Sequence, residues 1–185
     1  MPPGPLKSQA WVLLADLFLQ HWRMRFQAFE RTTSYGVPYN TSVEFNKTIQ
    51  EGAALTANHL RDQADHCPNQ RFVLSGLSKG AMVMHSTKLE NDIKSKVLAV
   101  LVFGDPWRPI GDFNNSWPID SPLINLNPRN GTLNTENVIS FCNVGDTICE
   151  TGTADPNSIP LPHLVYPTDG SVGIAVAFVR SKVQQ

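Results

Sequence analysis

The stretch LSGLSKG at residues 74–80 decides how this chain is interpreted. An apolar run that predicts a buried strand precedes it, and a helical pattern follows it. A strand, a tight turn and a helix are the setting in which Gly76-x-Ser78-x-Gly80 forms a nucleophile elbow. We expect the turn to hold Ser78 in a strained conformation with its hydroxyl exposed, and both glycines to let the strand and the helix approach closely. An ordinary turn rich in glycine and serine is the alternative.

Two residues further along the chain complete a possible catalytic set. Asp146 lies in the segment CNVGDTIC at residues 142–149, and His163 lies in the segment LPHL at residues 161–164. The order Ser78, Asp146, His163 is the order of nucleophile, acid and base in α/β-hydrolases. Taken alone, Asp146 could be a turn aspartate and His163 a surface histidine. Together with the elbow, they predict a Ser-His-Asp triad.

The other titratable candidates have simpler interpretations. Asp105 is a rival for the acid because it follows an apolar run, but its Gly-Asp-Pro setting is more simply a turn. No pair of the remaining histidines has the spacing of a metal site with a third ligand, so each is expected to be a core or surface side chain. No metal or other cofactor is therefore expected. These histidines are His21, His59, His66 and His85.

The pattern along the chain alternates helices with strands, which predicts a parallel sheet covered by helices on both faces. Helices are expected at residues 9–20, 42–64 (with Ser42 as its cap), 79–89 and 171–183. Strands are expected at residues 25–30, 71–75, 97–103 and 138–141. The run at 97–103 is continuously apolar, as in a central parallel strand. No repeat or linker divides the chain, so residues 1–185 are expected to form one domain.

Composition excludes several classes of partner. The chain has 185 residues, 41% of them hydrophobic, and a formal net charge of −1, so no long-range field would attract nucleic acid or anionic lipid. The apolar segment at residues 10–19 is too short to span a membrane and contains Asp16. We expect no nucleic-acid partner, no membrane span and a monomer.

These motifs resemble the cutinase family of small serine esterases, which includes acetylxylan esterases. The likeness covers roughly residues 51–178, and CNVGDTIC is its most specific part. It implies a three-layer α/β-hydrolase-like fold with a central parallel sheet. It also implies Ser78 as nucleophile, His163 as base and Asp146 as the acid that orients the base. The matching segments lie at residues 76–85, 101–106, 142–149, 163–166 and 169–170.

Further roles follow from the same resemblance. The backbone N–H of Lys79 would donate to the oxyanion, and a disulfide between Cys142 and Cys149 would hold the loop that carries Asp146. Apolar residues beside the base would form a rim for the acyl chain of the substrate. That rim is expected to consist of Ile159, Leu161 and Leu164.

The chain departs from the family pattern in four ways. Lys79 stands where the family usually has glutamine, which places a cation beside the nucleophile. The first strand, whose turn supplies a second oxyanion donor in the family, is expected to be missing. Residues 107–137 form a longer irregular segment than the resemblance implies. Cys67, bonded to an amino-terminal cysteine in the family, is expected to be free here, with the true start of the protein upstream of Met1.

The predicted function is a secreted carboxylic-ester hydrolase whose substrate is an aliphatic ester such as cutin. An acetyl ester on a polysaccharide is the second candidate substrate. A truncated, non-catalytic homologue that binds a surface is the alternative from another class. A disulfide and four N-glycosylation sequons indicate an oxidising compartment, although no signal peptide opens the chain. The sequons begin at Asn40, Asn46, Asn114 and Asn130.

Overall fold

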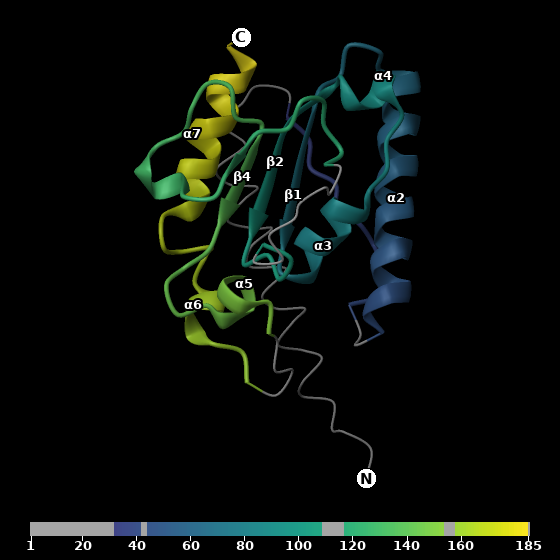
Figure 1. The fold of residues 1–185 in the computed structure, drawn as a ribbon. Coiled ribbons are helices and arrows are strands. Elements are labelled where there is room, and N and C mark those ends of the chain that lie inside the picture. Colours follow the sequence, from purple (N-terminus) through teal and green to yellow (C-terminus); the bar gives the residue numbers. More distant parts are fainter. Residues whose placement is uncertain (1–31, 42–43, 109–116, 154–157, 185) are drawn as a thin grey trace.

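The computed structural model describes residues 32–41, 44–108, 117–153 and 158–184. In this part of the chain, parallel strands form one sheet in the order β1-β2-β4-β3. Helices α2 and α3 cover one face of the sheet and α7 covers the other, so the fold has three layers (Figure 1). The strands are β1 (Phe72–Leu77), β2 (Val97–Phe103), β3 (Ile124–Asn125) and β4 (Val138–Phe141). The three helices are α2 (Phe45–His66), α3 (Lys79–Ser86) and α7 (Ser171–Val183).

Strand β2 is continuously apolar because both of its faces are buried. Val100 and Val102 pack into the cluster beneath α2 and α3, whereas Leu101 and Phe103 pack into the cluster beneath α7. Successive side chains of a strand point to opposite faces, so one run of sequence supplies both clusters. Burial of each such side chain contributes roughly 1.5–3 kcal/mol. The expectation of a central strand at residues 97–103 is confirmed.

Most other expected elements are present with small shifts. β4 and α7 have the expected bounds, and β1 runs on to Leu77. The helix expected at residues 79–89 ends at Ser86, because Thr87 is extended and its N–H donates to the Met84 carbonyl at 3.2 Å. A separate short helix, α4 (Asn91–Lys94), follows it.

Helix α2 begins later and ends later than the pattern predicts. Its first residue is Phe45, and the preceding Glu44 makes no side-chain cap; the predicted cap Ser42 lies outside the described residues. The helix continues to His66, where the Cys67 N–H donates to the Gln63 carbonyl at 2.8 Å. The helix expected at 9–20 and the strand expected at 25–30 also lie outside the described residues. None of the described helices is long and apolar enough to cross a bilayer.

The segment expected to be irregular, residues 107–137, contains regular structure in its second half. Strand β3 pairs with β4 through Ile124 opposite Val138, and a single 3-10 turn, η1 (Pro128–Asn130), follows. Two strand residues are too few to show an alternating pattern, so the sequence did not reveal β3. Its pairing makes Ile124 and Asn125 an edge strand of the described sheet.

The carboxyl ends of the strands bring three loops together. The Ser78 N–H donates to the Phe103 carbonyl at 2.8 Å, and the Gly104 N–H donates to the Phe141 carbonyl at 2.9 Å. The turns after β1, β2 and β4 therefore lie side by side. In parallel α/β sheets this edge is where ligands bind.

Candidate active site

The turn after β1 has the strain expected of an elbow, but Ser78 is buried, at 8% exposed, contrary to the expected exposure. Ser78 has φ 54° and ψ −119°, and it is one of two non-glycine residues with positive φ in the described part. A Cβ on Gly76 would lie 2.2 Å from the Gly80 carbonyl oxygen, so only glycine fits there. A Cβ on Gly80 would meet nothing nearer than the Tyr39 hydroxyl at 3.8 Å. Close packing thus requires Gly76, and the expectation for Gly80 is wrong.

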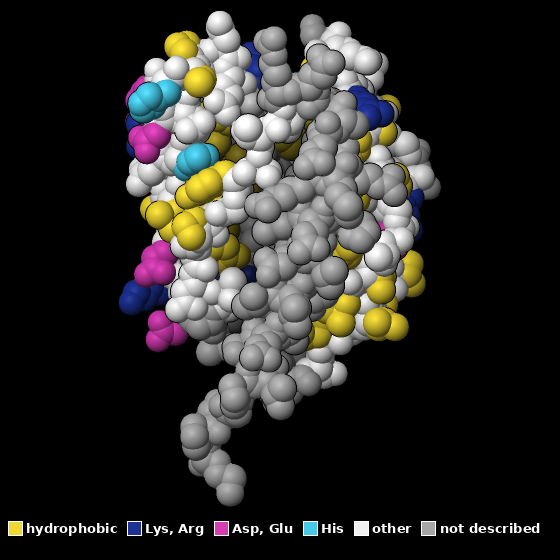
Figure 2. Space-filling view, turned by 180° about the vertical axis from the view of Figure 1, so that it is seen from behind, with side chains coloured by type: hydrophobic (Ala, Val, Ile, Leu, Met, Phe, Trp, Pro, Cys, Tyr) yellow, Lys and Arg dark blue, Asp and Glu magenta, His cyan; other side chains and the backbone are white. Residues whose placement is uncertain are grey.

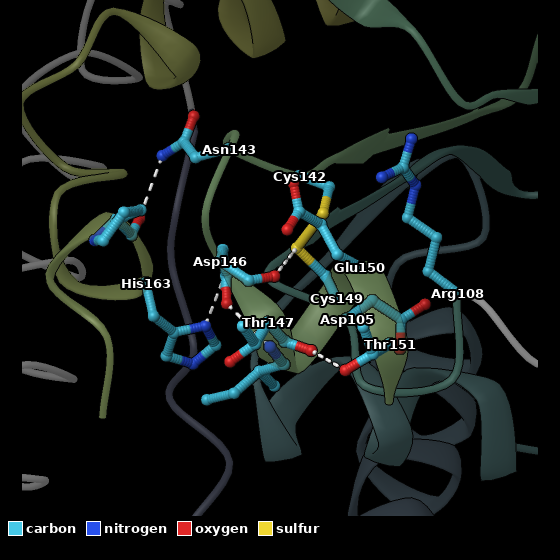
Figure 3. The surroundings of a disulfide bond; sticks show 12 residues. Asp105, Arg108, Cys142, Asn143, Asp146, Thr147, Cys149, Glu150, Thr151 and His163 are labelled. Atoms are coloured by element: carbon cyan, nitrogen blue, oxygen red, sulfur yellow. Dashed lines mark hydrogen bonds and ion pairs between the residues drawn. A yellow bond between two sulfur atoms is a disulfide. The ribbon is translucent and has the colours of Figure 1, made fainter. Parts of the chain in front are cut away.

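Asp146 lies in a covalently closed loop after β4. A disulfide joins Cys142 to Cys149, as the resemblance implies (Figure 3). Asp146 is fully buried and caps the short helix α5 (Thr147–Thr151), since its Oδ1 accepts the Ile148 N–H at 3.2 Å. A side-chain cap of this kind satisfies an N–H that the first turn of a helix leaves unpaired. The loop and the cap together fix the carboxylate.

His163 lies on the short helix α6 (Leu161–Leu164) and faces Asp146 (Figure 3). Its Nδ1 is 2.9 Å from Oδ2 of Asp146, and both side chains are almost fully buried. A carboxylate only accepts, so Nδ1 carries a proton, and in the neutral imidazole Nε2 is then the acceptor. Within the described residues, the buried Nε2 has no hydrogen-bond partner. The imidazole is therefore oriented at one nitrogen and available to take a proton at the other.

The charge on Asp146 is maintained by hydrogen bonds. Burial alone would raise the pKa of Asp146, but hydrogen bonds from His163 and Tyr166 outweigh burial and lower this pKa below its ordinary value. The Tyr166 hydroxyl donates to Oδ2 at 2.7 Å. Sequence reasoning matched Tyr166 to the family pattern without giving it a role, because nothing local shows that a tyrosine three positions after a histidine reaches the same carboxylate.

Gly104, at the end of β2, makes room for the His–Asp pair. Its φ is 54°, and an added Cβ would lie 2.5 Å from Cε1 and 2.7 Å from Nδ1 of His163. The same Cβ would lie 3.1 Å from Oδ2 of Asp146. The sequence pattern at this Gly-Asp-Pro turn predicts a role only for the aspartate. A glycine at the carboxyl end of the central strand was the available signal.

Asp105, the rival candidate for the acid of the triad, pairs with His85 and not with His163. Its Oδ2 is 2.7 Å from Nε2 of His85, and both side chains are buried. The ring of Trp117 lies 4.0 Å from the His85 ring, and Oδ1 of Asp105 accepts the Trp107 N–H at 3.0 Å. Asp105 thus ties the last turn of α3 to the loop after β2. His85 is a core histidine, as expected.

The Lys79 side chain is directed toward the layer of α2. Its Nζ donates to the Asn40 carbonyl at 3.3 Å and to the Thr48 hydroxyl, and it lies 5.9 Å from the Tyr39 ring centroid. Burial lowers the pKa of Lys79, and the charge of Glu51 partly offsets that effect. The backbone N–H of Lys79 belongs to the first turn of α3, where N–H groups are available for an anion.

Exposed apolar side chains lie on the loop that carries Asp146 and in residues 159–164, which carry His163. Leu161 is 72% exposed, and Ile159 and Leu164 are half-buried. Val144, which sequence reasoning missed, is 93% exposed on the disulfide loop. These two segments are in contact, since the side-chain amide of Asn143 donates to the Pro162 carbonyl at 3.0 Å.

The remaining predicted residues make contacts elsewhere or lie outside the residues that the structure describes. Cys67 is exposed and outside any disulfide of the described residues, His59 stacks on Tyr35, and Nδ1 of His66 contacts the Asp62 carbonyl. No described cluster of His, Cys, Asp and Glu could hold a metal ion. On the face shown in Figure 2, acidic and basic side chains of the described residues are interspersed. Asn40 and Asn46 are exposed; Asn114, His21 and the side chain of Asn130 are not described.

Comparison with known proteins agrees with this architecture. Cutinase cut1 of Trichoderma harzianum is 34% identical over 154 residues, which are 80% of this chain and 51% of that protein. The Trichoderma reesei cutinase structure in complex with a C11Y4 phosphonate inhibitor superposes with a TM-score of 0.65 at 30% identity, covering 91% of this chain and 67% of that one. The catalytic core domain of acetyl xylan esterase from Trichoderma reesei also superposes with a TM-score of 0.65, at 20% identity and 90% coverage of both chains, which shows the fold alone.

A parallel sheet with helices on both faces and a nucleophile-type elbow after a strand defines an α/β-hydrolase-like fold. The sequence model of the cutinase family matches residues 8–183. This chain belongs to the cutinase family. It spans about half the length of the curated relatives it matches.

Proposed function

We propose that this chain is a carboxylic-ester hydrolase in which Ser78 is the nucleophile, His163 the general base and Asp146 the acid that orients it. The observation that carries the proposal is the buried hydrogen bond of 2.9 Å between Nδ1 of His163 and Oδ2 of Asp146. It leaves Nε2 as a proton acceptor at the sheet edge where the strained Ser78 turn also lies. A histidine with one nitrogen held by a carboxylate is the general base of serine hydrolases.

The reaction follows from these positions. Nε2 of His163 takes the Ser78 proton as the hydroxyl oxygen attacks the ester carbonyl carbon, and Asp146 stabilises the imidazolium. The backbone N–H of Lys79, at the start of α3, donates to the oxyanion. His163 returns the proton to the departing alcohol, which leaves an acyl-enzyme. Water then attacks the acyl carbon and gives a proton to His163, which passes that proton to the Ser78 oxygen as the carboxylic acid leaves.

The substrate we propose is an aliphatic ester of the cutin type. Val144 and Leu161 expose apolar surface on the segments that carry the acid and the base, with Ile159 and Leu164 beside them. Apolar surface of this kind suits an alkyl chain better than a polysaccharide. An acetylated polysaccharide is supported only by the shared fold with acetyl xylan esterase. The disulfide between Cys142 and Cys149 supports secretion.

A p-nitrophenyl alkylphosphonate tests this function directly. We expect one phosphonyl group per chain, attached to the peptide that contains Ser78, as found by mass spectrometry of a digest. His163→Gln should prevent labelling, because the serine then lacks its base. A long-chain reagent should label faster than its methyl counterpart, and the reverse would favour the acetyl ester. A chain that stays unlabelled, or that is labelled elsewhere, contradicts the assignment and supports a binding protein without catalysis.

Gly104→Ala should disturb the base while leaving the nucleophile in place. The added methyl group would lie 2.5 Å from Cε1 of His163, at a φ of 54° that alanine adopts only with strain. Displacement of a catalytic group by 1 Å costs about a hundredfold in rate. We expect kcat for p-nitrophenyl butyrate to fall by at least this factor. Gly80→Ala is the matched control, because its methyl group would meet nothing nearer than the Tyr39 hydroxyl at 3.8 Å. Its kcat should fall by less than about tenfold in the same assay.

A further inference from the structure

The two oxygens of the Asp146 carboxylate accept unequal numbers of hydrogen bonds. Its Oδ2 lies 2.9 Å from Nδ1 of His163 and 2.7 Å from the Tyr166 hydroxyl, while its Oδ1 accepts the Ile148 N–H at 3.2 Å. The two donors therefore share one oxygen, and the tyrosine makes the shorter bond. A hydrogen bond to an ionised acceptor is among the strong ones in proteins, so neither donor can be ignored.

Tyr166 is held so that its proton points at Asp146. The ring is fully buried, at 5.9 Å and 66° from the Phe103 ring and at 6.2 Å and 85° from the His163 ring. The phenol oxygen also accepts the backbone N–H of Asn143 at 3.0 Å, so its own proton is directed to the carboxylate. Burial first, and then the bond to Asp146, raises the pKa of Tyr166 far above its ordinary value. The phenol thus remains a donor throughout the working range of an esterase.

We propose that Tyr166 is a positioning residue that fixes Oδ2 of Asp146 and weakens the pull of that oxygen on the His163 proton. The inference rests on the proposed function. A second donor withdraws negative charge from Oδ2, so the imidazolium at His163 is stabilised less than an unshared carboxylate would stabilise it. The base then releases its proton more readily, both to the leaving alcohol and to solvent.

Other charges around the pair are more distant and of mixed sign. Asp169, two residues before the start of α7, interacts electrostatically with Tyr166 and pairs with Arg129 at 3.0 Å. Arg108, on the loop after β2, interacts with Tyr166 and with Glu150 of α5. The test variants keep all of these groups, so a change in the titration of His163 reports the hydrogen bond from Tyr166.

Tyr166→Phe removes the donor and keeps the ring. We expect the titration midpoint of His163, followed by nitrogen-15 NMR and assigned with His163→Gln, to move up by about half to one pH unit. The acidic limb of kcat/KM should move with it. Tyr35→Phe, which changes a half-exposed ring stacked on His59, should move neither.

Fluorination of Tyr166 should shift the His163 titration midpoint in the opposite direction, and it removes no hydrogen-bonding group. The chain has three tyrosines, so Tyr35→Phe with Tyr39→Phe leaves Tyr166 as the one site for 3-fluorotyrosine. The fluorinated phenol is a stronger donor, so the His163 midpoint should move down. If Tyr166→Phe does not fold, the nearly isosteric fluorinated chain is sufficient to test the role of Tyr166.

The outcomes separate this inference from the proposed function. Midpoints that shift up without the hydroxyl and down with fluorine support the role of Tyr166. The role is overturned if the His163 midpoint changes in neither variant, or if it moves in the same direction in both. A folded chain without esterase turnover refutes the proposed function, while the NMR titration still decides whether Tyr166 acts on the His163–Asp146 pair.

Discussion

Ser78→Ala should reduce kcat for p-nitrophenyl butyrate by about a millionfold, the loss found when a triad serine is removed. The alanine keeps the Cβ and therefore the backbone strain at φ 54°, so the stability of the fold should change little. What disappears is the oxygen that forms the acyl-enzyme. The oxyanion donor and the binding surface remain, and they would account for the residual rate.

The assay needs a control serine outside the site. Ser95→Ala removes an exposed hydroxyl that donates to the Asp92 carbonyl at 2.7 Å, at the end of α4. It should retain the rate of the unaltered chain. Comparison at equal folded fraction, measured by circular dichroism, excludes a difference in folding. A Ser78→Ala chain that keeps more than about a hundredth of the rate would show that another group is the nucleophile.

Asp146→Ala should reduce kcat by about ten-thousandfold, somewhat less than loss of the nucleophile. Three donors then lose their acceptor inside the protein: Nδ1 of His163, the Tyr166 hydroxyl and the Ile148 N–H. Without the carboxylate, His163 is free to adopt the tautomer whose Nε2 carries the proton and cannot act as a base. Each unsatisfied buried donor costs about 1–3 kcal/mol, so the variant should also unfold more easily.

Asp146→Asn separates the charge from the hydrogen bonds. Two donors converge on Oδ2, so the amide oxygen should occupy that position and keep both hydrogen bonds, while the amide NH2 replaces Oδ1 and only the bond from the Ile148 N–H is lost. The tautomer of His163 is then preserved, and the charge that stabilises its imidazolium is lost. We expect a smaller loss of kcat than in Asp146→Ala. Equal losses in the two variants would show that orientation by a neutral acceptor contributes nothing.

Acid unfolding gives an independent measurement on the same residue. The pKa of Asp146 is lower in the folded chain than in the unfolded chain, where an aspartate has a pKa of about 3.9. The stabilisation is therefore complete above about pH 4 and is lost as the pH falls through the folded value. Asp146→Asn should lack this part of the acid dependence, and urea unfolding at pH 3 and pH 6 would measure the difference.

The sequence by itself determined the fold class, the central strand and the elbow. These features depend on neighbouring residues: seven consecutive apolar residues make β2, and Gly76 allows the turn at Ser78 because its α-carbon lacks a side chain. The family likeness added the disulfide between Cys142 and Cys149, which the structure contains. The roles assigned to Ser78, Asp146 and His163 stay predictions until the reaction is measured.

Only the tertiary structure decided which side chains share one carboxylate. Tyr166 and His163 are 20 and 17 positions from Asp146, and both reach Oδ2 because the loop after β4 and helix α6 meet at the sheet edge. Gly104 is needed because the His163 ring occupies the space of its Cβ. Asp105 binds His85 because the loop after β2 lies over α3. Each of these contacts joins segments that are far apart in the chain. The distances between such segments are set by how the layers pack, and residue types and their spacing do not specify that packing.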